Sequence, residues 1–159
     1  MLARLWKGFA LAAVLVLGGF GVRADDAAPI LGKWTISSYR IAPWARPEDS
    51  ALLNAEAKKL LKLQVTYTAK AVIAKHPTVG CKNAHYEKSS FLYDALFQGG
   101  LGEVSDDARA KVAKELGFPP PPVPGIELDC STGEYSYHFR DPNTVLFALN
   151  DVIYILTRQ

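Results

Sequence analysis

Apolar and polar side chains alternate with a period of two along much of the chain. Between residues 31 and 40, Trp34 and Ile36 alternate with Thr35 and Ser37. Further alternating or β-branched runs lie at residues 63–68, 71–74, 84–89, 126–130, 134–140, 144–149 and 152–157. This period is typical of strands that bury one face, and the short turns between the last four runs predict an antiparallel meander.

Two segments carry a helical pattern instead. Residues 47–59 begin with Pro47 and two acids and end with Lys58 and Lys59, an order that suits the helix dipole. Residues 105–116 begin with Ser105 as N-cap and stop before Gly117, and the Pro-rich run 118–125 predicts an extended connector. Together these patterns predict a mainly β (α+β) fold, in which an antiparallel barrel-like sheet of about seven to eight strands is accompanied by two short helices.

Residues 1–24 have the layout of an export signal. Arg4 and Lys7 precede an uncharged apolar run from residue 9 to residue 20, and Val22 and Ala24 supply small side chains for cleavage near Ala24. The apolar run is too short for a membrane helix, which needs about 20 residues. We therefore expect a periplasmic or secreted protein with no membrane span, whose residues 25–159 form a single domain.

The charge balance disfavours some partners. The whole chain has 18 Lys and Arg against 16 Asp and Glu. Arg4, Lys7 and Arg23 lie in the predicted signal, so the mature part is close to neutral. Such a domain has no basic excess with which to release counterions from nucleic acid. We expect no nucleic-acid partner.

Cys81 and Cys130 are the two cysteines of the chain. In an oxidising compartment such a pair is expected to form a disulfide. A second interpretation leaves the thiol free, because His76 and His85 flank Cys81 and the three side chains are of types that bind zinc or copper. Their spacing matches no specific metal motif. The disulfide is therefore the preferred prediction, and no metal or other cofactor is expected.

The run 135–140 is the strongest candidate for a binding strand. Its period places Tyr135, Tyr137 and Phe139 on one face, and His138 and Arg140 on the other. One interpretation is a core face with a solvated back. The other is a strand of a ligand-lining barrel, in which Tyr135, Tyr137, His138 and Arg140 orient a ligand.

Catalytic patterns are lacking in the sequence. It contains no Gly-x-Ser-x-Gly motif, and no other nucleophile has a base at a recognisable spacing. The acid pairs at residues 48–49 and 106–107 are explained as helix-start acids. An enzyme is therefore the least favoured class.

The triplet Gly32-Lys33-Trp34, on the first strand of a β-rich domain of this size, resembles the Gly-x-Trp signature of lipocalins and the wider calycin barrels. The resemblance implies that Trp34 packs at the closed end of a barrel beneath an Arg from the end of the last strand. Arg158 is the candidate for that partner, through a cation–π contact. The two helical segments and the Pro-rich connector depart from that family's plain run of eight strands.

Two functions follow as hypotheses. The leading one is a non-catalytic periplasmic protein that binds a small apolar or amphipathic molecule. The alternative is a protein that binds another protein, such as an inhibitor or immunity factor acting on an envelope enzyme, with the loop 76–85 as its contact surface. A lumen filled with side chains would count against the first hypothesis.

Overall fold

The computed structural model describes residues 24–159. The predicted signal peptide thus lies outside the described residues, except for Ala24. In the described part, nine strands form one antiparallel sheet in the order β4-β3-β2-β1-β9-β8-β7-β6-β5. The strands are β1 (Gly32–Ile41), β2 (Gln64–Thr68), β3 (Ala71–Ala74), β4 (Cys81–Lys82), β5 (His85–Phe91), β6 (Val123–Cys130), β7 (Gly133–Asp141), β8 (Thr144–Leu149) and β9 (Val152–Arg158).

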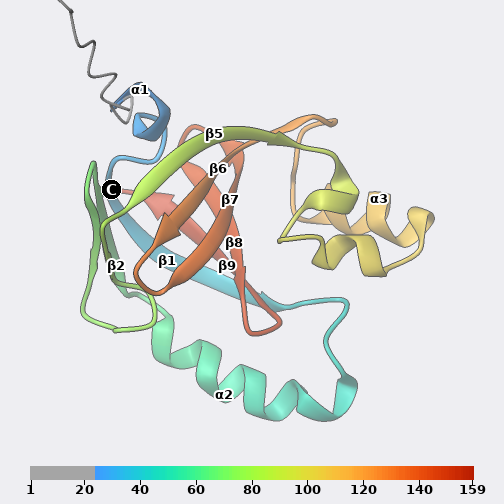
Figure 1. Ribbon diagram of the computed structural model, residues 1–159. Helices are drawn as coiled ribbons and strands as arrows, with labels where there is room; N and C mark the ends of the chain where they lie inside the picture. Colours follow the sequence, from blue (N-terminus) through green and yellow to red (C-terminus); the bar gives the residue numbers. More distant parts are fainter. Residues whose placement is uncertain (1–23) are drawn as a thin grey trace, which may run out of the picture.

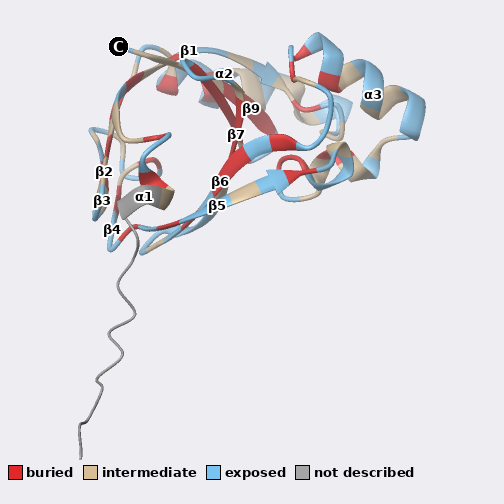
Figure 2. Ribbon diagram, turned by 90° about the horizontal axis from the view of Figure 1, so that it is seen from above, coloured by how far each residue is buried: buried red, intermediate tan, exposed pale blue. Residues whose placement is uncertain are grey.

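The sheet curls strongly, so that its two edges approach each other (Figure 1, Figure 2). Register shifts between Ile36 and Ser38 in β1 and between Phe139 and Asp141 in β7 mark bulges, which bend and twist strands. At the seam, the Ser131 N–H donates to the carbonyl of Lys82 at 3.1 Å, although β4 and β6 are not neighbours in the sheet. The fold is therefore a barrel-like sheet. Along one side, hydrogen bonds such as this one join β4 to the turn that follows β6.

Aromatic side chains fill the concave side of the sheet. Trp34, Tyr67, Tyr137 and Phe147 are all buried there. The ring centroids of Tyr67 and Tyr137 lie 5.4 Å apart, and those of Tyr137 and Phe147 lie 5.2 Å apart. Edge and tilted contacts at these distances are favourable for aromatic pairs. The lumen is thus packed with side chains.

Two helices close this core. The short α1 (Ala24–Ala27) lies at one end of the curl, where Ala27 is buried (Figure 2). The helix α2 (Ser50–Leu60), preceded by the 3-10 turn Pro47–Asp49, buries Ala57 and Leu60 against the same core. None of the described helices is long and apolar enough to cross a membrane.

A second apolar core lies on the outer face of the sheet. It contains Leu146 of β8 and Ile153 of β9, and a cover contributed by the segment 92–118 supplies Leu96, Phe97 and Leu101. The cover includes the 3-10 turns Tyr93–Ala95 and Gly100–Glu103 and the helix α3 (Asp106–Glu115). Strands β8 and β9 are therefore buried on both faces, which explains their nearly continuous apolar sequences.

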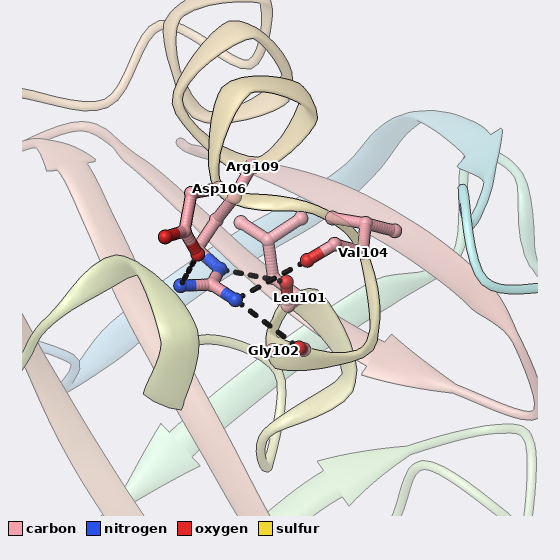
Figure 3. Close-up of polar contacts among 5 residues, drawn as sticks. All are labelled: Leu101, Gly102, Val104, Asp106 and Arg109. Atoms are coloured by element: carbon pink, nitrogen blue, oxygen red, sulfur yellow. Dashed lines mark hydrogen bonds and ion pairs between the residues drawn. The ribbon is translucent and has the colours of Figure 1, made fainter.

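Arg109 of α3 holds this cover together (Figure 3). Its guanidinium donates hydrogen bonds to the carbonyls of Leu101, Gly102 and Val104, each at 3.2 Å, and pairs with Asp106 at 3.0 Å. The planar fork of Arg suits several acceptors at once. Arg109 thus ties α3 to the backbone of residues 101–104.

The predicted fold class is confirmed, and most predicted strands are present within two or three residues of their expected bounds. The two predicted helices correspond to Pro47–Asp49 with Ser50–Leu60 and to Asp106–Glu115. The two-residue strand β4 and the turns of the cover have no counterpart among the predicted elements. The expectation of a solvated back of β7 is wrong at His138, which is fully buried beside Phe91 and Phe97.

Candidate functional site

Trp34 and Arg158 form a plug at the end of the lumen near α1. Trp34 is fully buried, donates its indole N–H to the carbonyl of Ile30 at 2.7 Å, and lies opposite Arg158 in the β1–β9 register. The Arg158 guanidinium carbon lies 4.3 Å from the centroid of the Trp34 ring. The predicted cation–π contact is therefore present.

Gly32 is fitted to this plug in two ways. Its φ of +116° is a conformation that side-chain-bearing residues rarely adopt, and a Cβ there would lie 3.3 Å from Nη1 of Arg158. Arg158 also donates to the carbonyls of Leu31 at 2.8 Å and of Pro29 at 2.5 Å. Its donors are thus engaged by the protein itself, and its role is structural.

A pocket of about 500 Å³ lies beside the plug, and we call it the end pocket. Its walls come from the segment after α1, from β5, β6 and β7, and from Arg158. The apolar part is formed by Pro29, Pro124, Phe139 and Pro142. The volume falls in the range of about 300–1,000 Å³ that is usual for small-molecule sites.

Two cations at the end pocket remain available to a ligand. Lys88 is exposed and lies opposite Ile126 of the lumen core, so it extends from the concave face of β5. Arg140 makes long contacts to Asp141 at 3.5 Å and to the Thr144 hydroxyl at 3.4 Å. Contacts of this length contribute little stability, so an anionic group at the end pocket can compete for the half-buried Arg140 guanidinium.

Asp141 is the acid of the end pocket, and it is held in its ionised form. Burial acts to raise its pKa, but the Asn143 N–H at 2.8 Å, the Thr144 hydroxyl and the Arg140 guanidinium outweigh burial and lower it. A carboxylate that accepts several hydrogen bonds stays charged. Asp141 therefore carries a negative charge that pairs with Arg140.

The structure does not bring the four predicted ligand-binding residues together. Tyr137 lies in the lumen core, whereas His138 lies in the outer core. Tyr135 is half-buried, with its hydroxyl 3.4 Å from the carbonyl of Thr78 near the seam. Arg140 alone of the four lines the end pocket. Successive residues of a strand face opposite sides, so they share a site only where a bulge intervenes.

His138 is fully buried in an aromatic environment. Its Nε2 accepts a hydrogen bond from the Phe97 N–H at 2.8 Å, and its ring centroid lies 4.5 Å from that of Phe91 and 5.0 Å from that of Phe97. Burial lowers the pKa of His138 to about 3. The imidazole is therefore neutral and serves as an acceptor that fixes the cover on the sheet.

Cys81 and Cys130 are neighbours, and both are free thiols in the structure. Burial, followed by the hydrogen bond with Cys130, raises the pKa of Cys81 to about 12. The alternative metal site at His76, Cys81 and His85 finds no support, because no group of three or more His, Cys, Asp or Glu side chains within residues 24–159 is arranged to hold a metal ion.

Sequence reasoning missed most of the end pocket. Lys88 lies in a predicted strand, but its face could be assigned only from its register with Ile126. Phe139 was placed on the aromatic face correctly, yet nothing local indicates that it borders a pocket. A weak signal was the presence of Pro29, Pro124 and Pro142 near the ends of strands, because proline has no N–H to donate to a sheet and is confined to such positions.

Comparisons with family models, with curated proteins and with solved structures give no match for this chain.

Proposed function

We propose that this protein is a non-catalytic binding protein that holds a small amphipathic molecule in the end pocket, with the apolar part against Phe139 and the prolines and an anionic group against Lys88 and Arg140. The observation that carries the proposal is a pocket of about 500 Å³ with apolar walls and two cations at its margin, of which Lys88 is exposed and Arg140 is held by long contacts. A few placed polar groups around an apolar surface are typical of small-molecule sites.

The site differs from that of the original hypothesis. Trp34, Tyr67, Tyr137 and Phe147 occupy the lumen, so a ligand there would have to displace well-packed aromatic rings at a cost of several kcal/mol. The end pocket needs no such displacement. The resemblance to lipocalins supports one part of the proposal, namely that a curled antiparallel sheet with a Trp–Arg plug is a rigid support for a binding site.

Titration calorimetry with dodecanoate tests the proposal. The anion is expected to bind with a dissociation constant in the micromolar range, and dodecanol more weakly because it lacks the charge. Arg140→Gln and Lys88→Gln should each weaken dodecanoate binding about five- to tenfold, which corresponds to about 1 kcal/mol for a partly exposed charge contact. Lys111→Gln, an exposed residue of α3, is the matched control and should bind like the wild type.

A second variant separates the site from general surface charge. Ala28 lines the end pocket from the segment after α1 and is exposed, so Ala28→Trp should fill the pocket and abolish binding while the fold persists. Equal binding by the wild type and by Ala28→Trp would mean that dodecanoate binds elsewhere, and the proposal would be withdrawn.

We also propose that the protein is exported and that Cys81 and Cys130 become a disulfide there. The adjacency of the two thiols supports the pairing. Each thiol loses a proton and an electron, and a disulfide of an exported thiol oxidant accepts both electrons and both protons. Thiol counting on unfolded, unreduced protein from the periplasm should give no free thiol. Two free thiols would contradict the proposal.

A further inference from the structure

Strand β5 ends the sheet and keeps one backbone edge unpaired (Figure 1). It pairs with β6 alone, from His85 opposite Asp129 to Phe91 opposite Val123, without a register shift. Among residues 24–159, no backbone hydrogen bond joins β5 to a segment other than β6. Because the bonds of an antiparallel pair involve every second residue, the residues between them direct their N–H and C=O groups away from the sheet.

The register of the neighbouring strands shows which residues these are. Cys130 and Gly133 close the two-residue turn between β6 and β7, so this pair exchanges hydrogen bonds, and the even-numbered residues of β6 bond to β7. The odd-numbered residues of β6 then bond to β5. Pro124, which has no N–H, accordingly stands opposite Ser90 at a position without bonds between the strands. The backbone groups of Lys88 and Ser90 therefore lie along the free edge.

This part of the edge is open and borders the end pocket. Lys88 and Ser90 are both exposed. Lys88 and Ser89 line the end pocket together with Ala28 and Pro29, which are exposed as well. An extended chain added beside β5 would therefore run along the margin of the end pocket, and every second side chain of it would face the concave side of the sheet.

The charge of Lys88 restricts what can pair with this edge. Lys88 extends from the concave face of β5, since it lies opposite Ile126 of the lumen core. Among residues 24–159, no carboxylate forms an ion pair with it. An inward-facing charge on an edge strand opposes the addition of an ordinary apolar strand. A strand that places an acid beside Lys88 meets no such obstacle, because opposite charges across a strand pair are favourable.

We infer that the free edge of β5, which we define as residues 86–90, binds an extended segment of a partner protein that places an acidic side chain beside Lys88 and apolar side chains on either side of that acid. Backbone hydrogen bonds to Lys88 and Ser90 supply affinity, and alternate side chains supply selectivity. The inference rests on the proposed function, because an apolar side chain of the segment enters the end pocket.

Other occupants match the edge less well. A fatty acid anion fits the end pocket but leaves the backbone groups of the edge unpaired. A second copy of the protein, joined through β5 by a two-fold axis at Lys88, would set two ammonium groups opposite each other, which is unfavourable. An acidic, extended segment satisfies both the backbone and the charge.

Fluorescence anisotropy with a labelled heptapeptide tests the inference. Threonine at the odd positions alternates with valine, glutamate and valine, an order that is the same in both strand directions, and the termini are blocked. The peptide is expected to bind with a dissociation constant in the micromolar range. Glutamine in place of its glutamate should weaken binding about fivefold. Lys88→Gln should bind the two peptides alike, because the charge pair is then absent.

N-methylation of the peptide separates strand addition from binding by side chains alone. Methyl groups are placed either on the second and fourth nitrogens or on the third and fifth. In an added strand one of these sets faces β5 and the other faces away. One methylated peptide should therefore bind at least tenfold more weakly, through the loss of two hydrogen bonds, and the other should bind like the parent. Equal effects of the two methylation patterns would overturn the inference.

Ser90→Pro tests the edge from the side of the protein. Proline removes an N–H that points away from β6, a position that an edge strand tolerates. The variant should bind the peptide at least tenfold more weakly, because the ring also obstructs an added strand. It should bind dodecanoate like the wild type, because Ser90 does not line the end pocket. Retained dodecanoate binding also shows that the variant is folded.

The results distinguish this inference from the proposed function. Dodecanoate binding without peptide binding, even at millimolar peptide, would overturn the inference and leave the proposed function standing. Failure of both ligands to bind would contradict both. Sedimentation of the free protein should show a monomer. A dimer that the peptide does not dissociate would mean that a second copy occupies the edge, and it would overturn the inference.

Discussion

Acid should destabilise this fold through His138, and His138→Gln should remove that part of the pH dependence. The imidazole is fully buried, and burial lowers its pKa from 6.5 to about 3. Between these two values the unfolded chain binds a proton at His138 that the folded chain does not bind. The contribution of the neutral imidazole is therefore fully present above pH 6.5 and is lost as the pH falls toward 3.

The size of the effect follows from linkage. Each pH unit below the unfolded pKa removes up to about 1.4 kcal/mol from the free energy of unfolding. Between about pH 7.5 and pH 4.5 the loss at His138 is therefore about 2 to 3 kcal/mol. Gln in place of His138 keeps an acceptor for the Phe97 N–H but has no titratable group. The free energy of unfolding of the variant therefore lacks the loss that protonation of His138 causes at acid pH.

Urea unfolding at about pH 7.5, 6.5, 5.5 and 4.5 measures the effect. At the highest pH, His138→Gln should be less stable than the wild type, because the aromatic contacts of the ring are lost. This difference should shrink by about 2 to 3 kcal/mol as the pH falls to 4.5. His85→Gln, at an exposed position, is the control. A difference between the wild type and His138→Gln that stays constant with pH would refute the reasoning.

Three further predictions concern stability. Arg158→Lys should lower the free energy of unfolding by about 1 to 3 kcal/mol, because a lysine cannot cover Trp34 and donate to several carbonyls at once; urea titration measures the loss, and an unchanged midpoint would contradict the plug. Arg109→Lys should lower the free energy of unfolding by about 1 to 2 kcal/mol and speed amide hydrogen exchange in residues 93–104. Unchanged exchange there would show that the cover does not depend on Arg109. A disulfide between Cys81 and Cys130 closes a loop of about 50 residues and should raise the free energy of unfolding by about 3 to 4 kcal/mol relative to the reduced chain. Calorimetric melting with and without reductant measures the difference, and equal melting temperatures would contradict the prediction.

The strands could be predicted because one buried face imposes a local period of two. The runs 144–149 and 152–157 were found even though both of their faces are buried, since turn residues bound them. Strand β4 has only two residues, Cys81 and Lys82, too few for any period. The 3-10 turns of the cover have no apolar period either, so its docking on the sheet could not be read from local pattern.

The candidate site was less predictable because it depends on contacts between distant parts of the chain. Trp34 and Arg158 were paired from a family resemblance, and the structure brings them together. His138 was placed on a polar face, but Phe97, 41 residues earlier, covers it. Arg140 lines the end pocket through the bulge after Phe139. Alternation alone cannot indicate either the cover or the bulge.

The most direct test of the central claim, that the end pocket and not the lumen binds an amphipathic anion, is amide chemical-shift mapping by NMR during titration with dodecanoate. Saturable shifts are predicted at Lys88, Ser89 and Arg140, which line the end pocket. The amides of Tyr67 and Phe147, whose side chains fill the lumen, should stay unchanged. Shifts centred on Tyr67 and Phe147, or no saturable shift anywhere, would contradict the account.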